Sequence, residues 1–439
     1  MALGSAAAQA ADLGGDCCGD LEERIAELEA TTARKGNRKV SLKISGWVNE
    51  QPLYWDDGTE SNVYVGNNDQ ERTRFKFAGE AKIDADWSAG YTIEIGVRDT
   101  RSSRYSQNDD EGGAALGLDI RKSSWFLKSK TYGKLTVGHD GSSTYHLLDD
   151  ADFTNTRYYA DAESITTIGI PGYFLRVDGT TLRTGATTNA TWGNILSPGA
   201  TNTPGNGERP DIIRYDSPEF KGFYVSASWG EDDLWDTALV YQGEIGEFQI
   251  AGRIGYAEYT DAPGGTGSGH CTGGSDPAKC TEFGGSATVM HKPTGLYVYG
   301  AYGQKNDDTR DLKYAAAVRP FIDDEDQTWY LQAGIERKWH PLGTTTIFGS
   351  YRHDDVGGAL TSSAVDFDGG AYAGQGYITG LDMGTWSGGV VQNIAAAAMD
   401  VYLIYSHVDG EVSTLRTGVP GTLDIDTMQF FQAGARIQF

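Results

Sequence analysis

The stretch FQAGARIQF, residues 431–439, decides how this chain is interpreted. Apolar or small side chains stand at every second position, and the positions between them are polar or glycine: Phe431, Ala433, Ala435, Ile437 and Phe439 against Gln432, Gly434, Arg436 and Gln438. Successive side chains of a strand point to opposite faces, so this segment has one apolar face and one wet face. It is therefore predicted as a strand that separates two different surroundings.

The same alternation returns far upstream and predicts many strands with an apolar face. Examples are Phe75, Phe77, Gly79, Ala81 and Ile83; Tyr91, Ile93, Ile95 and Val97; Phe223, Val225, Ala227 and Trp229; and Trp329, Leu331, Ala333 and Ile335. Any one of these faces is better explained as the core face of a soluble strand. Nearly a dozen together leave few apolar residues to cover them, so we expect them to face lipid.

Composition agrees with a membrane protein built from strands. No run of eighteen or more apolar residues occurs in the 439 residues, which excludes membrane-spanning helices. A spanning strand needs only about ten alternating residues, and its other face stays polar. Aromatic residues, at 11% with 24 Tyr and 10 Trp, suit belts at two membrane interfaces.

Turn signals divide the chain into sixteen predicted strands, an even number as in bacterial barrels. The predicted ranges are 40–55, 71–84, 89–99, 118–130, 133–140, 211–218, 222–231, 234–244, 247–260, 281–292, 295–304, 327–339, 344–354, 384–394, 400–409 and 426–439. Every second connection is tight, whereas those between are mostly long and polar, such as 261–280 and 355–383. A soluble sandwich has no reason to sort its loops in this way.

The predicted fold is therefore all-β, a 16-stranded antiparallel transmembrane β-barrel over residues 39–439 in the outer membrane. Phe431, Ile437 and Phe439 are its predicted C-terminal assembly signal, which implies the outer-membrane assembly machinery as a partner.

The first 38 residues are predicted to lie outside the barrel. Residues 1–10 end in the small-x-small pattern Ala8-Gln9-Ala10 and are interpreted as a signal-peptide remnant. Within 11–38, Leu21, Ile25 and Leu28 recur at helical spacing, which predicts a short periplasmic helix that resembles a coiled coil. Two heptads are too few for an isolated coiled coil, so either several copies associate or the helix packs on its own barrel.

The net charge and the cysteines further restrict the possible partners of the protein and its cellular compartment. The net charge of −25 argues against nucleic acid as a partner. Acidic outer loops either stay solvated or bind the divalent ions that bridge lipopolysaccharide. Cys271 and Cys280 enclose a polar run, which predicts a loop disulfide formed in an oxidising compartment. The adjacent Cys17 and Cys18 receive no assigned role.

The polar face of residues 71–84 carries Arg72, Arg74 and Lys76 in alternation, spaced about 6.6–7 Å apart. Lys43, Arg98 and Arg121 on neighbouring strands add to this basic wall, although the phase of Arg121 is ambiguous. We interpret the wall as one side of a channel constriction. The alternative is a solvated charge ladder in a wide channel.

Residues 141–210 form the longest connection, and a loop of this length in a compact domain calls for a function. Its carboxylates are Asp149, Asp150, Asp152, Asp161 and Glu163, with Arg157, Arg176 and Arg183 among them. If they face the basic wall, a transverse field crosses a narrow aqueous eyelet and disfavours apolar solutes, because desolvating charged groups is costly. Part of the loop could instead cover the outer mouth or touch a neighbouring subunit.

Signs of enzyme chemistry are poor. The seven His residues are scattered, and the patterns His-Glu-x-x-His and Gly-x-Ser-x-Gly do not occur. The Asp-rich runs lack the glycine and terminal glutamate of a calcium loop. We expect no enzymatic activity, no cofactor and no metal site.

Three motifs resemble those of a known family. DLEERIAELEATTARKGNRKVSLKISGWVNE at 20–50, WDDG at 55–58 and SKTYGKLTVG at 129–138 resemble the porins of Hyphomicrobiales and related alphaproteobacteria. The resemblance implies a homotrimeric, sixteen-stranded pore for passive diffusion of small hydrophilic solutes, with the inward loop at 141–210. Lipid and lipopolysaccharide would surround it, and peptidoglycan is a further candidate partner if the N-terminal helix tethers the envelope. The overall acidity favours a weak preference for cations, which the basic wall could reverse.

Overall fold

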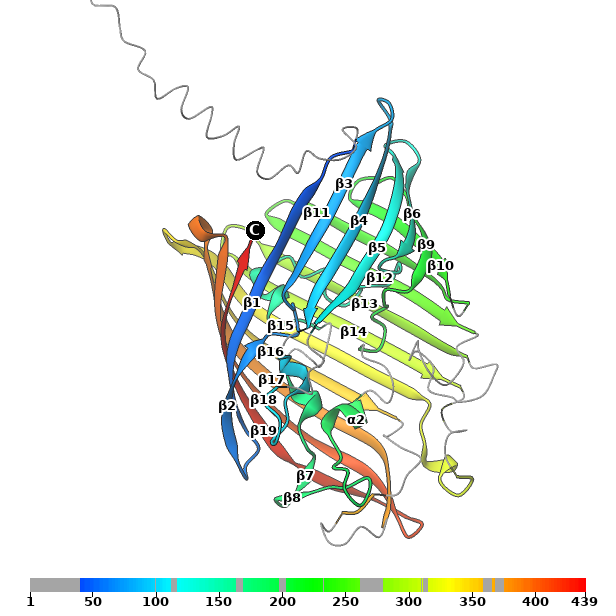
Figure 1. Cartoon of the computed structure of the whole chain (residues 1–439), viewed down its shortest axis with the longest axis vertical. Helices are drawn as coiled ribbons and strands as arrows, with labels where there is room; N and C mark the ends of the chain where they lie inside the picture. Colours follow the sequence, from blue (N-terminus) through cyan, green and yellow to red (C-terminus); the bar gives the residue numbers. More distant parts are fainter. Residues whose placement is uncertain are drawn as a thin grey trace, which may run out of the picture.

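A computed structural model describes residues 40–98, 100–111, 117–162, 169–196, 203–231, 233–260, 279–308, 310, 315–357, 365–367 and 375–439. Seventeen strands join in one sheet whose neighbours all run antiparallel (Figure 1). They are β1 (Lys43–Asp56), β2 (Ser61–Asn67), β3 (Arg74–Lys82), β4 (Trp87–Arg98), β5 (Gly117–Ser129), β6 (Gly133–His139), β9 (Asp211–Asp216), β10 (Phe223–Gly230), β11 (Trp235–Ile245), β12 (Phe248–Tyr259), β13 (Cys280–His291), β14 (Leu296–Asp307), β15 (Glu325–His340), β16 (Gly343–Val356), β17 (Gly376–Ile394), β18 (Met399–Arg416) and β19 (Val419–Gln438).

These seventeen strands fill sixteen positions of a barrel, because β2 and β3 share one position. β2 pairs with residues 50–56 of β1, and β3 pairs with residues 43–47 of the same strand. The predicted 16-stranded antiparallel barrel is confirmed, and each predicted strand overlaps one barrel strand. β2 was not predicted, since its residues lie upstream of the predicted strand 71–84.

The barrel closes between β1 and β19. Val48 pairs with Ile437 on the outer face, where the two side chains are 47% and 48% exposed. Phe439 exchanges two backbone hydrogen bonds with Gly46, both at 3.0 Å. A Cβ atom at Gly46 would lie 2.8 Å from the ring of Phe439, so glycine leaves the room that this ring needs. The C-terminal segment therefore lies at the seam of the barrel, and its role as an assembly signal stays a prediction.

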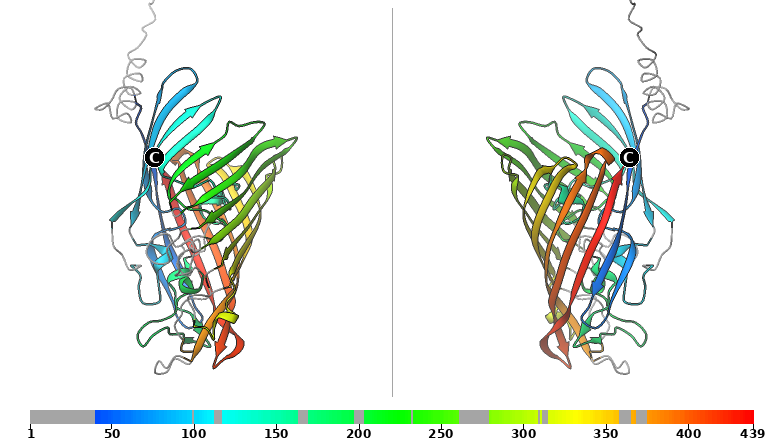
Figure 2. Two further views of the ribbon diagram at one scale, coloured as in Figure 1. Left: turned by 90° about the vertical axis from the view of Figure 1, so that its right-hand side faces the viewer. Right: turned by 90° about the vertical axis from the view of Figure 1, so that its left-hand side faces the viewer.

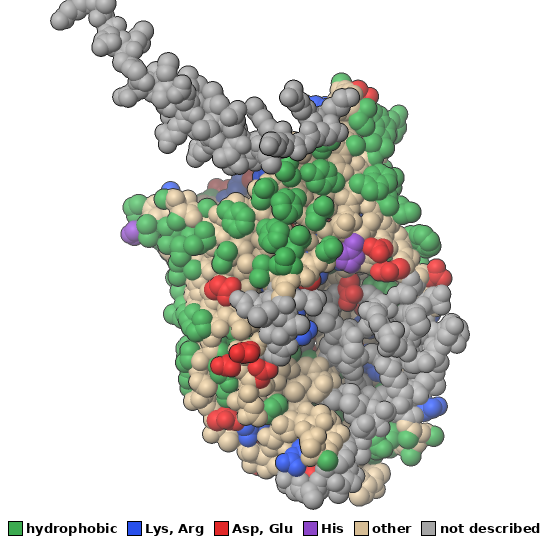
Figure 3. All heavy atoms as spheres, viewed as in Figure 1, with side chains coloured by type: hydrophobic (Ala, Val, Ile, Leu, Met, Phe, Trp, Pro, Cys, Tyr) green, Lys and Arg blue, Asp and Glu red, His purple; other side chains and the backbone are tan. Residues whose placement is uncertain are grey.

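The outer surface of the barrel is apolar, as the alternation predicts. Directly paired residues share a face, and the outward members stay exposed, for example Phe223 at 46%, Trp229 at 57% and Leu331 at 50%. Figure 3 shows hydrophobic side chains gathered over β1 and β3–β5 on one side of the molecule. In a bilayer this surface meets lipid.

The connections are sorted between the two ends of the barrel. One end, called the short-turn end, carries 83–86, 130–132, 217–222, 246–247, 292–295, 341–342 and 395–398. The opposite end, called the long-loop end, carries all the long connections, 99–116, 140–210, 260–279, 308–324 and 357–375, together with the short ones 57–60, 231–234 and 417–418. The C-terminus lies at the short-turn end (Figure 1).

Part of the predicted loop sequence at the long-loop end is strand instead. β18 and β19 extend through 410–416 and 419–425, and Thr417 and Gly418 join them with φ of 50° and 79°, as a primed two-residue hairpin turn requires. β17 likewise begins at Gly376, inside the loop predicted for 355–383. Val412 and Ile425, at 0% and 4% exposure, belong to a buried cluster with residues of the connection 140–210. Contact with that connection accounts for the extension.

The remaining elements are short. They are β7 (Arg176–Val177), β8 (Thr180–Thr181), α2 (Trp192–Leu196) and the 3-10 turns Ser102–Arg104, Asn155–Tyr158, Ile170–Gly172, Arg319–Phe321 and Ala395–Ala397. In the described ranges, no helix has both the length and the apolar character needed to cross a bilayer. Leu21, Ile25 and Leu28 lie outside the described residues, as do Cys17 and Cys18, so the N-terminal helix stays a prediction.

Candidate functional site

In the long connection between β6 and β9, residues 141–162 fold into the barrel. We call these residues the lumen segment and residues 169–196 of the same connection the rim segment. The rim segment, which includes α2, β7 and β8, lies at the long-loop end (Figure 1), and the side views of Figure 2 show the same arrangement. The lumen segment lies deeper, against the inner faces of the strands.

The first half of the lumen segment follows the inner wall from one strand to the next. In order round the wall, Ser143 N–H donates to Ser228 of β10 at 3.0 Å, Thr144 Oγ1 donates to Asp236 of β11 at 2.7 Å, Ser286 of β13 donates to the Leu147 carbonyl at 2.6 Å, and Tyr299 of β14 donates to the Leu148 carbonyl. Each of these strand residues is buried, so the bonds form away from bulk water. The segment is thus fixed to the wall by directional polar contacts.

The second half of the segment is fixed on β15 and β18. Tyr159 stacks on Tyr402 with ring centroids 4.4 Å apart, and its hydroxyl donates to Asp400 at 2.8 Å. On β15, Gln332 donates to the Thr156 hydroxyl at 2.6 Å, and Tyr330 donates to the Ala160 carbonyl at 3.1 Å. The lumen segment therefore runs round most of the inner wall instead of standing free in the interior.

Two predicted acidic residues of the loop are paired with cations close by. Arg157 donates to Asp149 at 2.7 Å and also to Asp150. His146 lies 2.8 Å from Asp149, and Arg253 of β12 lies 3.0 Å from Asp150. The described chain contains one group with metal-ligand atoms within mutual reach, namely His146, Asp149 and Asp150. Arg157 already supplies a cation to both carboxylates of this group.

The other predicted carboxylates of the loop lie deeper. Asp152 accepts hydrogen bonds from Thr154 N–H at 2.8 Å and from the Thr156 hydroxyl at 3.0 Å. Burial raises the pKa of Asp152 to about 6, although these two bonds act in the opposite direction. Asp161 is also buried, and Glu163 lies outside the described residues.

Three of the six predicted basic residues lie together, and each is paired with a carboxylate. The pairs are Arg72–Asp119 at 2.9 Å, Arg74–Glu71 at 2.7 Å, Arg74–Glu94 at 3.3 Å and Arg121–Glu94 at 3.0 Å. Lys76 shares the lumen face of β3 with Arg74, and Lys43 lies on the same face of β1 opposite Ala78. Arg98 is the last residue of β4, and its side chain lies outside the described part.

The acidic loop and the basic wall meet where Arg157 lies 3.5 Å from Glu71. Each side also contains charges of the opposite sign, so the arrangement is not one purely acidic surface facing one purely basic surface. The predicted transverse field therefore stays a prediction, with a more mixed charge pattern behind it.

Sequence reasoning did not single out Glu71, Glu94, Asp119 and Arg436. For Glu94 and Arg436 a signal existed, because each lies on the polar face of an alternating strand. Glu71 lies in the irregular segment 68–73, which turns into the lumen so that the Glu71 carbonyl accepts hydrogen bonds from Trp47 and Asn49. No local pattern marks such a turn.

The structure describes only one of the two cysteines in the predicted loop disulfide. Cys280 at the start of β13 is buried and disulfide-bonded. Cys271 lies outside the described residues, so the pairing of Cys271 with Cys280 stays a prediction.

Comparison with known proteins gives a family model and several similar folds. A family model described as Gram-negative porin matches residues 1–435. The chain is similar to the anion-selective porin from Comamonas acidovorans, with a TM-score of 0.54 and 15% identity over 91% of this chain and 100% of that one. It is also similar to in-vitro folded OmpT, an outer membrane protein of Vibrio cholerae, in its trimer form, with a TM-score of 0.50 and 13% identity over 91% and 99%. No curated protein matches the chain. At such low identity the two structures establish the fold alone, whereas the family match spans nearly the whole sequence.

Proposed function

The chain belongs to the Gram-negative porin family, and we propose that the lumen segment and the facing wall of β3–β5 form the constriction of its channel. As a porin, it is a water-filled channel in the outer membrane through which small hydrophilic solutes and ions diffuse passively. The proposed basic side consists of Lys43, Arg72, Arg74, Lys76, Arg98 and Arg121, and the proposed acidic side of Asp149, Asp150, Asp152, Asp161 and Glu163.

The path of the lumen segment carries this proposal. Its bonds to Ser228, Asp236 and Ser286 hold it against the inner wall, so its bulk reduces the open interior of the barrel. Charged side chains remain around it, and an apolar solute that passes must displace water from them. That desolvation is costly, so the passage favours hydrophilic solutes.

A deletion tests the constriction. Replacing residues 146–160 by a short Gly-Ser linker removes the part of the segment with the most wall contacts. We expect single-channel conductance in planar bilayers to rise by about two-fold or more, because the narrowest part of a pore dominates its resistance. A Gly-Ser insertion after Gly418, at the tip of the β18–β19 hairpin, is the control and should conduct like the unmodified protein. Unchanged conductance in the deletion variant would locate the constriction elsewhere.

Charge selectivity is proposed to be weak, with a preference for cations. The described lumen pairs bring together similar numbers of basic and acidic groups, so neither sign dominates locally. The net charge of −25 then favours cations near the mouths. Reversal potentials measured across a salt gradient test this, and an anion-selective value would reject it.

The assembly of the channel is proposed from its family and its sequence. We infer a homotrimer in contact with lipid and lipopolysaccharide, inserted by the outer-membrane assembly machinery and related to the alphaproteobacterial branch of the family. The N-terminal segment 11–38 would help to trimerise the protein or tether it to peptidoglycan, which is the alternative structural function. In either case, deleting residues 12–38 should leave conductance intact, and a large loss of conductance would contradict both roles.

No catalytic function is proposed. The family consists of channels, and passive diffusion requires no reaction, cofactor or metal. The predicted disulfide between Cys271 and Cys280 would stabilise the loop before β13, and a mass shift on reduction of the tryptic peptides would test it.

A further inference from the structure

Seven charged side chains form an alternating row across the lumen, from β12 to β5. In order they are Arg253, Asp150, Arg157, Glu71, Arg74, Glu94 and Arg121. The separations are 3.0 Å for Arg253–Asp150, 3.5 Å for Arg157–Glu71, 2.7 Å for Glu71–Arg74, 3.3 Å for Arg74–Glu94 and 3.0 Å for Glu94–Arg121, and Asp150 is in close contact with Arg157. The row thus joins β12, the lumen segment, the inward turn 68–73 and strands β3–β5.

We propose that the Arg157–Glu71 pair ties the lumen segment to the β3 side of the barrel and thereby determines the open cross-section and solute size limit of the channel. This rests on the proposed constriction and adds Glu71 and Arg157 to it as size-determining residues. In addition to the hydrogen bonds that hold the segment on the wall, Asp150 pairs with Arg253 of β12 and Arg157 pairs with Glu71 of the inward turn.

Both partners of the tie are held in place. The Glu71 backbone is fixed by Trp47 and Asn49, whose side chains donate to its carbonyl at 3.1 and 3.0 Å. The Glu71 side chain is 6% exposed and that of Arg157 is 14% exposed, so little water screens the pair. When one partner is removed, the other keeps counter-charges of its own, Arg74 for Glu71 and Asp149 and Asp150 for Arg157, so a substitution breaks the tie without leaving an unpaired buried charge.

Charged side chains beside the row stay partly exposed to water. They lie on β5, where the row ends, and on β9, which stands between β5 and β12 in the order of the wall. Lys122 is 24% exposed, Arg214 is 21% exposed and Asp216 is 16% exposed. Releasing the lumen segment from Glu71 is expected to enlarge the open cross-section beside the row, which widens the path available to a solute.

Neutral replacements of the two partners test the tie. We would measure single-channel conductance, open-channel current noise and reversal potential of Glu71→Gln, Arg157→Gln and the double variant in planar bilayers. Folded barrels would be verified by their heat-modifiable gel mobility. Glu244→Gln is the matched control, since it removes the same charge from a pair with Lys292 that lies 2.5 Å apart at the short-turn end. If Arg157→Gln does not fold, Arg157→Lys replaces it, because Lys keeps the charge but not the planar pair of donors.

The tie predicts a specific combination of results. Both single variants should gain conductance by roughly 1.5-fold or more with added noise, while their reversal potentials move in opposite directions because opposite charges are removed. The double variant should match Arg157→Gln, since both changes break one contact. Conductance changes of opposite sign that add in the double variant would overturn the tie and leave only an effect of charge. Wild-type conductance in Glu71→Gln, together with a gain in the 146–160 deletion, would refute the tie but keep the constriction. No gain in either variant would refute both.

Discussion

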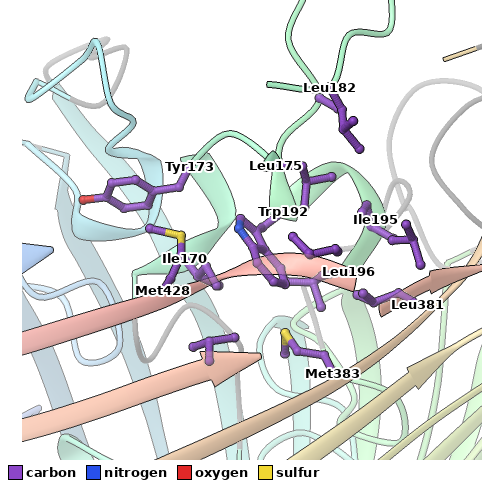
Figure 4. Close-up of a cluster of buried hydrophobic side chains, with 14 of the residues drawn as sticks. Ile170, Tyr173, Leu175, Leu182, Trp192, Ile195, Leu196, Leu381, Met383 and Met428 are labelled. Atoms are coloured by element: carbon purple, nitrogen blue, oxygen red, sulfur yellow. The ribbon is translucent and has the colours of Figure 1, made fainter. Parts of the chain in front are cut away.

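The lumen segment and the rim segment of the long connection are held by different forces. The rim segment is attached mainly by apolar burial, with Ile170, Trp192 and Ile195 completely buried beside Met383 and Met428 of the barrel wall (Figure 4). The lumen segment is attached mainly by hydrogen bonds and ion pairs to strand side chains. The same connection is thus attached by apolar contacts at the mouth and by polar contacts in the lumen, where the channel contains water.

The difference has a physical reason. Apolar burial holds a segment strongly but excludes water from the space that it fills. Directional polar contacts hold a segment in one position while leaving charged groups and water beside it. Attachment at the mouth is therefore expected to withstand changes of pH and salt, and attachment in the lumen to respond to them. Three substitutions test this contrast, in order of decreasing effect.

Trp192→Ala should release the rim segment alone. Truncating a completely buried Trp costs about 3–5 kcal/mol, which exceeds the stability expected of a short surface-attached segment. Hydrogen exchange measured by mass spectrometry should show lost protection across 169–196 and unchanged protection across 143–160. If both segments lose protection together, they form one cooperative unit and the contrast fails.

Asp152→Asn should remove a pH dependence of the lumen segment. The pKa of Asp152 is raised from 3.8 to about 6, so this residue favours the docked segment most below pH 3.8, and its contribution is lost as the pH rises through about 6. The shift corresponds to about 3 kcal/mol between these limits. Hydrogen exchange of 149–157, corrected for intrinsic rates, should become faster from pH 4 to pH 7 in the unmodified protein.

In Asp152→Asn the same region should show no such change, because the amide mimics the protonated carboxyl. The rim segment 169–196 serves as the internal control within each sample. Equal pH dependence in the two proteins would assign the effect to another group.

Tyr159→Phe should have the smallest effect. It removes the hydroxyl bond to Asp400 but keeps the ring stacked on Tyr402, and a net loss of about 1 kcal/mol is expected for one such bond. A few-fold faster exchange of the amides at 156–161 would report it. Tyr158→Phe, which keeps its ring 3.7 Å from Arg436, is the matched control and should change exchange less.

Much of the barrel could be predicted from alternation. Lipid outside and water inside impose a period of two on every spanning strand, and residues 431–439 show that period in its simplest form. Where the surroundings change, the prediction loses accuracy. The inner contacts of Val412 and Ile425 come from the folded connection, so the outer part of the β18–β19 hairpin was predicted as loop.

Less of the candidate site than of the barrel could be predicted from the sequence. The lumen face of Arg74 and the inward position of the long connection follow from strand phase and strand order. The pairing of Arg74 with Glu94 needs the register between β3 and β4, and the meeting of Arg157 with Glu71 needs the path of the whole connection. Neither property is encoded locally. Glu71 in particular lies where a barrel strand is interrupted, and only the three-dimensional structure shows that interruption.

The seam between β1 and β19 has a consequence for biogenesis. Trp47 and Gln438 are neighbours there, although almost the entire polypeptide separates them. Hairpins elsewhere in the wall join strands that are close in sequence and can form early. The pairing of β1 with β19 joins the strands that are farthest apart in sequence, so we expect it to be the slow final step. Until it forms, β1 and β19 are two unpaired edge strands, and each can pair with an edge strand of another nascent molecule. A catalyst of insertion that covers both edge strands until they pair would therefore affect the yield of folded barrels more than the stability of the folded barrel.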